Sequence, residues 1–261
     1  VLLKHLIYRF MENSDYIFGI HSAIEAIEAG RTVDKLLIKK DLNGELAIRL
    51  IHLAKDYGIP VQRVPVEKLN RITRKNHQGV IGFMSAVAYY SLEDILPAMF
   101  EDGVLPFLLV LDGITDVRNF GAIARTAECC GVNAIVIPQR GSVTVGADAV
   151  KTSAGALLHI PVCRVASLPQ AVQYIKDSGC QIVCATEKAS ENYTLGDYTT
   201  PLALVMGAED TGISPEVLRK ADTRSAIPMF GKIGSLNVGV AAGVMMYEVV
   251  RQRLDGNLEI I

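Results

Sequence analysis

Short apolar runs alternate with helical patterns along the second part of the chain, and this alternation limits the possible folds more than any other feature. The runs are FLLVLD, AIVIP, IPVCRV, QIVCAT, LALVMG and RSAIPM, all between residues 107 and 229. Continuous apolar runs of this length are typical of strands buried between two layers of helices. Strands joined through helices need right-handed crossovers. The sequence therefore predicts an α/β domain with a mostly parallel sheet.

A smaller α/β unit is expected in front of this domain. Helical patterns cover 20–29, 44–57 and 67–72, and strand patterns cover 35–38, 61–64 and 79–85. Residues 91–105 contain acidic residues, a proline and a glycine without a sheet pattern, so we expect a linker there. The first ten residues precede Met11 and are predicted to be an extension. The expected domains are thus 11–90 and 106–261.

Composition and absent motifs exclude several classes of protein. No apolar run reaches the roughly 18 residues that span a bilayer, so we expect no membrane contact and a cytoplasmic location. The five cysteines form no C-x-x-C pair and predict buried free thiols. The nucleotide-binding motifs G-x-G-x-x-G and G-x-x-x-x-G-K-[ST] are absent, as are G-x-S-x-G and H-E-x-x-H. Because the five histidines are scattered, no metal site is expected.

Charge is distributed unevenly along the chain. The formal net charge is −2, but residues 1–90 carry 13 basic and 9 acidic residues, whereas residues 91–261 carry 13 and 19. In the basic front unit, positive side chains concentrate in one short span: Arg63, Lys68, Arg71, Arg74, Lys75 and His77. Such a span suits docking of RNA phosphates, and it is equally compatible with a solvated charged edge.

Three stretches place polar groups after buried strands. Leu111–Gly131 leaves a strand at Asp112 and enters a helix near Gly121. Leu202–Ser214 leaves a strand through glycines and Glu209, and IPMFGKIGSLNVG, residues 227–239, passes through a glycine-rich loop into a final helix over 238–254. Ligands of parallel sheets bind at the carboxyl ends of the strands. We therefore expect the three stretches to share one crevice.

Simpler interpretations of the same residues stay open. Arg125 is predicted to point away from the core and can be an ordinary surface arginine. Asn119, Ser235 and Asn237 can be helix N-caps, and Glu209 can be a turn carboxylate. The apolar stripe of the final helix can face the core or a second copy of the chain.

The three stretches resemble the motifs of one known family. N-F-G-A-I-A-R (Asn119–Arg125), G-A-E-D-T-G (Gly207–Gly212) and I-P-M-x5-S-L-N-V (Ile227–Val238) are similar, in this order, to motifs of the SpoU/TrmH family of RNA 2'-O-ribose methyltransferases, which belongs to the SPOUT class. The front unit resembles the L30e-like RNA-binding domain of the subgroup that methylates a guanosine of 23S ribosomal RNA. FGIHSAIEAI (Phe18–Ile27) and NHQGVIG (Asn76–Gly82) carry that similarity.

The resemblance implies a fold, a cofactor and a site. The fold would be an α/β domain with a deep trefoil knot, working as a homodimer, and the cofactor would be S-adenosylmethionine (SAM). Residues matched to cofactor contacts are Met206, Gly207, Ile227, Pro228 and Leu236. Residues matched to the catalytic cluster are Asn119, Arg125, Glu209, Ser235 and Asn237. The bare glycine-rich loop would let main-chain groups approach an adenine.

Other functions remain open. The chemistry would be unchanged on a tRNA ribose or on a ribosomal site whose methylation confers antibiotic resistance. A non-catalytic RNA-binding factor is a different class, and the polar cluster around Arg125 argues against it because a pure binder does not need one. An arginine is a poor general base, since its pKa exceeds about 12, so a positioning and electrostatic role for Arg125 is favoured.

Overall fold

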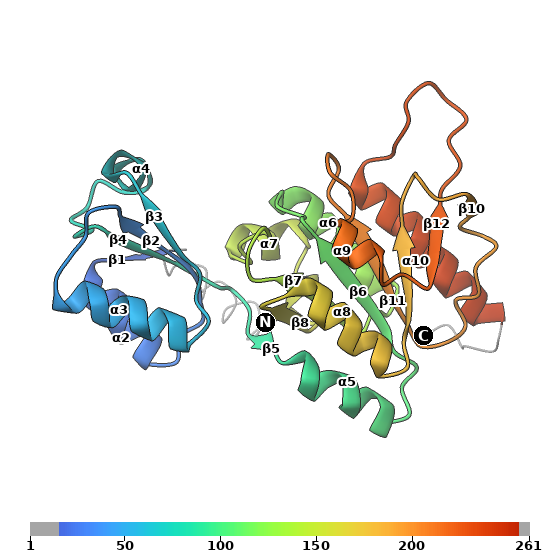
Figure 1. Cartoon of the computed structure of the whole chain (residues 1–261), viewed down its shortest axis with the longest axis horizontal. Helices are drawn as coiled ribbons and strands as arrows, with labels where there is room; N and C mark the ends of the chain where they lie inside the picture. Colours follow the sequence, from blue (N-terminus) through green and yellow to red (C-terminus); the bar gives the residue numbers. More distant parts are fainter. Residues whose placement is uncertain (1–15, 256–261) are drawn as a thin grey trace, which may run out of the picture. The chain divides into compact units, whose positions relative to one another are not determined.

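The computed structural model describes residues 16–255, and of Asp255 only the backbone, so the predicted extension over residues 1–10 lies outside the described part. The chain forms two compact units, which are described separately here (Figure 1). The first comprises the described residues up to Ala88 together with Thr144–Asp148. The second comprises Tyr89–Val143 and the residues from Ala149 onward.

The first unit is a four-stranded sheet with helices on both faces. Its elements in chain order are β1 (Tyr16–Phe18), α2 (Ile20–Glu28), β2 (Val33–Lys39), α3 (Glu45–Asp56), β3 (Val61–Val64), α4 (Val66–Ile72) and β4 (Val80–Met84). The strand order is β1-β4-β2-β3. Every helix and strand predicted here is confirmed. The three-residue β1 was missed because it is too short to show a pattern.

Alternation of side chains decides which face of this sheet each helix covers. Leu36 and Ile38 of β2 pack with α2 and α3 in one buried cluster. Leu37, between them in sequence, points to the opposite face and packs with Leu69 of α4. A strand that is apolar on both faces is therefore needed at the centre of the unit.

The second unit is built on an eight-stranded sheet in which all the strand pairs described are parallel. Its order is β10-β12-β9-β11-β6-β7-β8-β5. All six strands predicted from apolar runs are confirmed, and two-residue strands β5 and β10 are added at the edges. The strands are β5 (Tyr89–Tyr90), β6 (Phe107–Asp112), β7 (Ala134–Pro138), β8 (Val162–Val165), β9 (Gln181–Ala185), β10 (Glu191–Asn192), β11 (Leu202–Gly207) and β12 (Thr223–Ala226).

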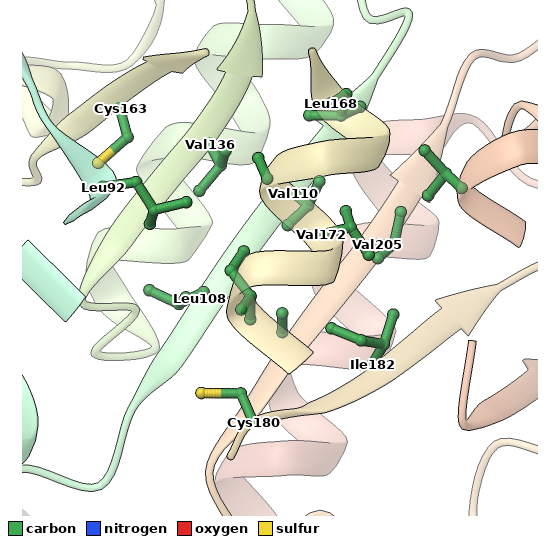
Figure 2. Close-up of a cluster of buried hydrophobic side chains, with 14 of the residues drawn as sticks. Leu92, Leu108, Val110, Val136, Cys163, Leu168, Val172, Cys180, Ile182 and Val205 are labelled. Carbon is green, nitrogen blue, oxygen red and sulfur yellow. The ribbon is translucent and has the colours of Figure 1, made fainter. Parts of the chain in front are cut away.

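Helices cover both faces of this sheet. They are α5 (Leu92–Glu101), α6 (Val117–Cys129), α7 (Ala147–Thr152), α8 (Leu168–Asp177), α9 (Pro215–Leu218) and α10 (Val238–Asp255), with a 3₁₀ turn at Ala156–Leu158. Figure 2 shows α8 lying over the central strands, with Leu168 and Val172 above Leu108, Val110 and Val205. Helices α6 and α10 pack against each other, and α10 contacts β11.

The prediction of a linker over residues 91–105 is wrong for most of that segment. Residues Leu92–Glu101 form α5, capped by the Ser91 hydroxyl, which accepts a hydrogen bond from Asp94 N–H at 3.2 Å. Leu92 and Leu96 are fully buried in the core of the second unit. Pro97 misled the prediction, because a proline inside a helix is disfavoured. The one-sided burial of leucines four residues apart was the better signal.

Two smaller expectations also need correction. Four cysteines are buried, and burial raises the pKa of Cys130, Cys163 and Cys184 to about 12, but Cys129 is exposed. The helix expected near Gly121 begins at Val117, because the carboxylate of Asp116 caps it by accepting from Arg118 and Asn119 N–H, both at 2.9 Å. In residues 16–255, no helix combines the length and apolarity of a membrane span.

The carboxyl-terminal part of α10 is tied to the start of the sheet. Arg253 donates hydrogen bonds to four backbone carbonyls, those of Leu105, Pro106, Tyr198 and Thr200, at 2.9–3.3 Å. Its guanidinium carbon also lies 5.2 Å from the ring centroid of Phe107. The Arg253 side chain thereby links the segments that precede β6 and β11 to α10. The trefoil knot implied by the resemblance stays a prediction.

Candidate functional site

Four neighbouring strands carry their loops to one edge of the sheet. The order β12-β9-β11-β6 is parallel throughout, so the segments after Ala226, Ala185, Gly207 and Asp112 leave the sheet at the same side. The carboxylate of Asp112 accepts a hydrogen bond from Ser214 N–H at 2.7 Å, which joins the loop after β6 to the turn after β11. The three stretches that were predicted to share one crevice all reach this edge, but of these only 202–214 and 227–239 line the pocket there, and the first stretch contributes Asn119 instead.

Glu209, Asn119 and Asn237 form one hydrogen-bonded cluster at this edge, although they are far apart in sequence. Asn119 Nδ2 donates to Glu209 Oε1 at 3.3 Å, and Asn237 Nδ2 donates both to that oxygen and to Asn119 Oδ1, the latter at 3.0 Å. Glu209 Oε1 also accepts from Val238 N–H at 3.1 Å. The structure thus brings together three of the five predicted catalytic residues.

Asn237 belongs to this cluster and also caps α10. Its Oδ1 accepts from Gly239 N–H at 3.0 Å and Val240 N–H at 3.4 Å, as an N-cap does. The carboxylate of Glu209 lies at the same helix end, where the unpaired N–H groups and the helix dipole favour a negative charge. The simpler N-cap interpretation of Asn237 is therefore correct, and it does not exclude the catalytic one, because Nδ2 serves the cluster.

Arg125 lies two turns along α6 from the cap at Asp116, on the solvent side of the helix. Within residues 16–255 its guanidinium has no hydrogen-bond or ion-pair partner. Its neighbours Ile123, Ala124 and Ala127 are fully buried, which fixes the helix face that carries it. An arginine held on a rigid helix without a partner can bind an incoming anionic or hydroxyl group without first breaking an internal bond.

A pocket opens beside the cluster. Met206, Gly207, Ile227 and Leu236, four of the five predicted cofactor contacts, line it. Glu209 and Ser235 of the predicted catalytic set line it too, with Ser235 exposed. The fifth predicted contact, Pro228, lines an adjoining hollow together with Ile227 rather than this pocket.

Several residues that line the pocket were not among the predicted contacts: Ala185, Thr186, Glu187, Ala208, Gly212, Ser225, Met229, Val238 and Ala241. Gly234 belongs to the glycine-rich loop that was expected to approach an adenine. Thr186 is the last residue of the predicted strand run QIVCAT, and Glu187 directly follows it. The rule that led to the other loops, that ligands bind at carboxyl ends of parallel strands, applies to this strand as well and would have found them.

Glycines around the pocket serve two different purposes. A Cβ at Gly207 would lie 2.2 Å from the Gly212 carbonyl carbon, so the fold itself requires glycine there. At Gly231 and Gly234 a Cβ would meet nothing within 4 Å, and neither has a positive φ. The fold does not need glycine at these two positions, and Gly234 lines the pocket. The bare backbone at Gly234 is therefore available to a ligand.

The predicted RNA-binding side chains of the first unit are exposed with one exception. Arg63, Lys68, Arg71, Arg74 and Lys75 are exposed, and Arg63 donates to the Lys40 carbonyl at 2.8 Å. His77 is 9% exposed: its Nδ1 accepts from Gly79 N–H at 3.0 Å, and Nε2 lies 2.9 Å from Asn70 Oδ1. Both ring nitrogens are occupied, so His77 shapes the loop and is not a phosphate contact. The proximity of His77 to basic residues in sequence was misleading.

Metal ligation has no support in the part of the chain that is described. From Tyr16 to Asp255, no group of three or more His, Cys, Asp or Glu side chains is arranged to hold an ion.

Comparison with known proteins identifies the family. Residues 106–247 match the description "SpoU rRNA Methylase family", and residues 16–90 match "RNA 2'-O ribose methyltransferase substrate binding". A Bacillus subtilis protein named as a TrmH family tRNA/rRNA methyltransferase is 39% identical over 242 residues, which are 93% of this chain and 97% of the relative.

Two solved structures are similar over nearly the whole chain. An AdoMet-bound rRNA methyltransferase from Sinorhizobium meliloti has a TM-score of 0.57 at 27% identity, covering 90% of this chain and 86% of the other. The SpoU methyltransferase AviRb from Streptomyces viridochromogenes, in complex with AdoMet, has a TM-score of 0.58 at 25% identity, covering 93% and 91%. Together with the matched motifs, these similarities establish that the chain belongs to the SpoU/TrmH family of RNA methyltransferases.

Proposed function

We propose that the protein transfers the methyl group of SAM to the ribose 2'-hydroxyl of a guanosine in large-subunit ribosomal RNA. The observation that carries the proposal is the meeting, at one sheet edge, of a pocket with exposed backbone and the cluster of Glu209, Asn119 and Asn237. Arg125, on the helix that supplies Asn119, adds a cation with no hydrogen-bond or ion-pair partner among residues 16–255.

The pocket fits a nucleoside cofactor. Met206, Ile227 and Leu236 offer apolar surface to an aromatic base, and the bare backbone at Gly234 offers hydrogen-bonding groups. The sulfonium of SAM would supply an electrophilic methyl group. Because loss of the sulfonium charge drives the displacement, the protein has to exclude water and align the ribose oxygen. Ser235 is placed at the pocket to contact the reacting groups, and we assign it that role.

Arg125 acts in this proposal by positioning and by electrostatics. A guanidinium does not release a proton near neutral pH, so it cannot serve as an ordinary base. It can bind the 2'-oxygen or an adjacent phosphate and stabilise negative charge as the hydroxyl gives its proton to water or to a neighbouring RNA phosphate. The oxygen takes the methyl group, and S-adenosylhomocysteine leaves. Glu209 Oε1 already accepts bonds from Asn119, Asn237 and Val238, so we assign this carboxylate to holding the cluster in place. The cluster orders the start of α10 and links it to α6, the helix that carries both Asn119 and Arg125.

The first unit would hold the RNA. Reversing Arg71, Arg74 and Lys75 to Glu should abolish RNA binding and leave SAM binding unchanged, because these exposed side chains belong to the other unit. Unchanged RNA affinity in this variant would contradict the assignment.

The target is tested by mapping ribose methylation by mass spectrometry in RNA from a strain that lacks the gene. We expect one guanosine of the large-subunit RNA to lose its methyl group and to regain it when the wild-type gene is restored, but not when an Arg125→Ala gene is restored. Loss of a methyl group from tRNA instead would favour the second candidate, a tRNA ribose methyltransferase. The Bacillus subtilis relative is named as a tRNA/rRNA methyltransferase, and this name is compatible with either kind of RNA.

A third possibility, a non-catalytic RNA-binding factor, is separated from both enzymes by calorimetry. We expect the purified protein to bind SAM. No heat of binding at millimolar SAM would refute the enzyme proposals together.

We also propose a homodimer in the cytoplasm. Val240, Tyr247 and Leu254 are exposed on α10 and lie seven residues apart, so they form one apolar stripe on the solvent side of the helix. Light scattering at micromolar protein should give the dimer mass, and Tyr247→Lys should shift it toward the monomer. A monomeric wild-type protein would contradict this part of the proposal.

A further inference from the structure

One face of the sheet in the first unit is only partly covered. Register places Tyr16, Phe83 and Lys35 in one row across β1, β4 and β2, and places Phe18 in the next row with Ile81 and Leu37. Paired residues of neighbouring strands point to the same side, so these rows share a face. Figure 1 shows α2 and α3 together on one side of this sheet and the short α4 away from them.

Helix α4 covers only the β2–β3 side of that face. Its Leu69 is buried with Leu37, Val64 and Ile81. The rings of Tyr16, Phe18 and Phe83 lie toward the edge strand β1 and are only half-buried. Three partly exposed aromatic rings therefore lie on the neighbouring strands β1 and β4.

The three rings form a connected group. The ring centroids of Tyr16 and Phe83 are 6.5 Å apart with planes at 54°, and those of Tyr16 and Phe18 are 6.5 Å apart with planes at 50°. Contacts between these neighbouring rings are made at an angle rather than face to face, so they do not cover a whole ring face, and all three residues stay partly exposed.

Two lysines accompany the rings. Lys35 Nζ lies 4.8 Å from the Phe83 ring centroid, and Lys75 Nζ lies 5.4 Å from that of Phe18. From Tyr57 to Leu92 the sequence holds five basic residues and one acidic residue, Glu67. The rings therefore lie in a strongly positive part of the unit, which suits a polyanion with flat, apolar groups rather than an apolar protein segment.

We propose that this face binds a single-stranded segment of the RNA substrate, with unpaired bases stacked on Phe18 and Phe83 and phosphates bound by Lys35 and Lys75. The proposal rests on the proposed function and deepens it by naming the form of the RNA that the first unit recognises. Bases inside a duplex have both faces covered by their neighbours, whereas unpaired bases can stack on protein aromatic rings. Alternating ring and ammonium groups match the alternation of base and phosphate along a strand.

Replacement of the rings by leucine tests the stacking. Phe18→Leu and Phe83→Leu keep an apolar side chain of similar burial but remove the flat ring. Fluorescence anisotropy in the full-length protein should give roughly tenfold weaker binding of a short unstructured oligoribonucleotide for each change. Tyr57→Leu is the matched control, because Tyr57 is an exposed aromatic residue of the same unit at the end of α3, away from this face. Equal affinities for all three variants and the wild type would overturn the proposal.

Lysine variants keep the test valid if a ring variant fails to fold. Lys35→Gln and Lys75→Gln should each weaken RNA binding. Each should also reduce the slope of log Kd against log salt concentration by the amount expected for about one lost phosphate contact. Lys55→Gln on α3 should change neither the affinity nor the slope. A short RNA duplex should compete poorly with the unstructured strand. Preference for the duplex, or an unchanged salt dependence in both variants, would refute the assignment.

The outcomes separate this inference from the proposed function. If the wild-type protein methylates RNA but the ring and lysine variants bind it normally, the sheet face is not the RNA contact and the enzyme proposal stands. If the variants lose RNA binding while no RNA is ever methylated, the face binds RNA and the enzyme proposal fails. Binding of a protein to this face in place of RNA would appear as unchanged affinity for every oligoribonucleotide.

Discussion

The two ends of helix α10 differ in their hydrogen-bond partners. At its first turn, Asn237 and Glu209 are exposed and bonded mainly to each other, to Asn119 and to free N–H groups of the helix. At its last turns, Gln252 and Arg253 bond backbone groups of the chain at residues 105–106 and 196–200. The first end is a polar cluster beside a pocket, and the last end joins distant parts of the fold.

The difference shows how one helix can serve stability and chemistry at once. Side chains that bond backbone groups of distant segments contribute to the fold because they hold these segments together, and leaving the buried carbonyls among their partners unpaired is costly. Exposed polar clusters contribute little to stability, since water competes for every bond. The pocket end can therefore carry catalytic groups and open backbone without endangering the fold. Changes at the two ends should affect different quantities.

Arg253→Met should have the largest effect on stability. It removes the donors for four carbonyls and keeps an apolar chain against Phe107, so we expect the free energy of unfolding to fall by about 2–4 kcal/mol. Denaturant unfolding measures this, with Arg219→Met, an exposed arginine next to α9, as control. A fall below about 0.5 kcal/mol would mean that the last turns do not hold the fold as described.

Asn237→Ala should have a smaller effect on stability and a large one on activity. Loss of the N-cap should cost about 1 kcal/mol, and disorder of Glu209 and Asn119 should slow methyl transfer roughly 100-fold. Unfolding and single-turnover transfer are measured on the same preparation. If transfer slowed only as much as the folded fraction decreased, Asn237 would be a cap and nothing more.

The last turns should also respond to pH through Glu248. Hydrogen bonds from Arg251 and Gln252 hold the pKa of this nearly buried carboxyl below its usual value. Glu248 therefore contributes fully to the free energy of unfolding above its unfolded pKa of 4.5, and this contribution is lost as the pH falls through the lower pKa of the folded state. The stability difference between wild type and Glu248→Gln should shrink on acidification from pH 6 to about pH 3. A difference that stays constant with pH would contradict this.

Gly234→Ala should change stability least of these variants, in contrast to Arg253→Met at the carboxyl-terminal end of α10. The fold has room for the added Cβ, so stability should be unchanged or higher by up to about 1 kcal/mol. The methyl group would restrict approach to the pocket backbone, so SAM binding should weaken severalfold by calorimetry. Gly231→Ala is the matched control, because Gly231 is equally open and lines neither the pocket nor the adjoining hollow. Equal SAM affinity in both variants would remove Gly234 from the cofactor contacts.

The sequence predicted the amino-terminal end of α10, with its polar cluster, better than the carboxyl-terminal end, where Arg253 lies. Apolar runs fixed the sheet, and three loop motifs located Glu209, Asn119 and Asn237, because those loops follow predicted strands. Arg253 gave no signal, since its partners are carbonyls, which every residue carries. His77 and residues 91–105 misled for a related reason. The burial of the His77 ring and the presence of Pro97 inside α5 depend on contacts with distant parts of the fold. Neither can be predicted from the local sequence pattern.

The central claim is that Arg125, on the helix that supplies Asn119 to the cluster, is a cation available to the RNA and is not needed for the stability of the fold. Single-turnover methyl transfer by Arg125→Ala, measured together with SAM affinity and unfolding, tests it most directly. We predict transfer at least about 100-fold slower than wild type, with SAM affinity and the free energy of unfolding unchanged. Transfer at the wild-type rate, or a loss explained by weaker SAM binding or instability, would contradict the claim.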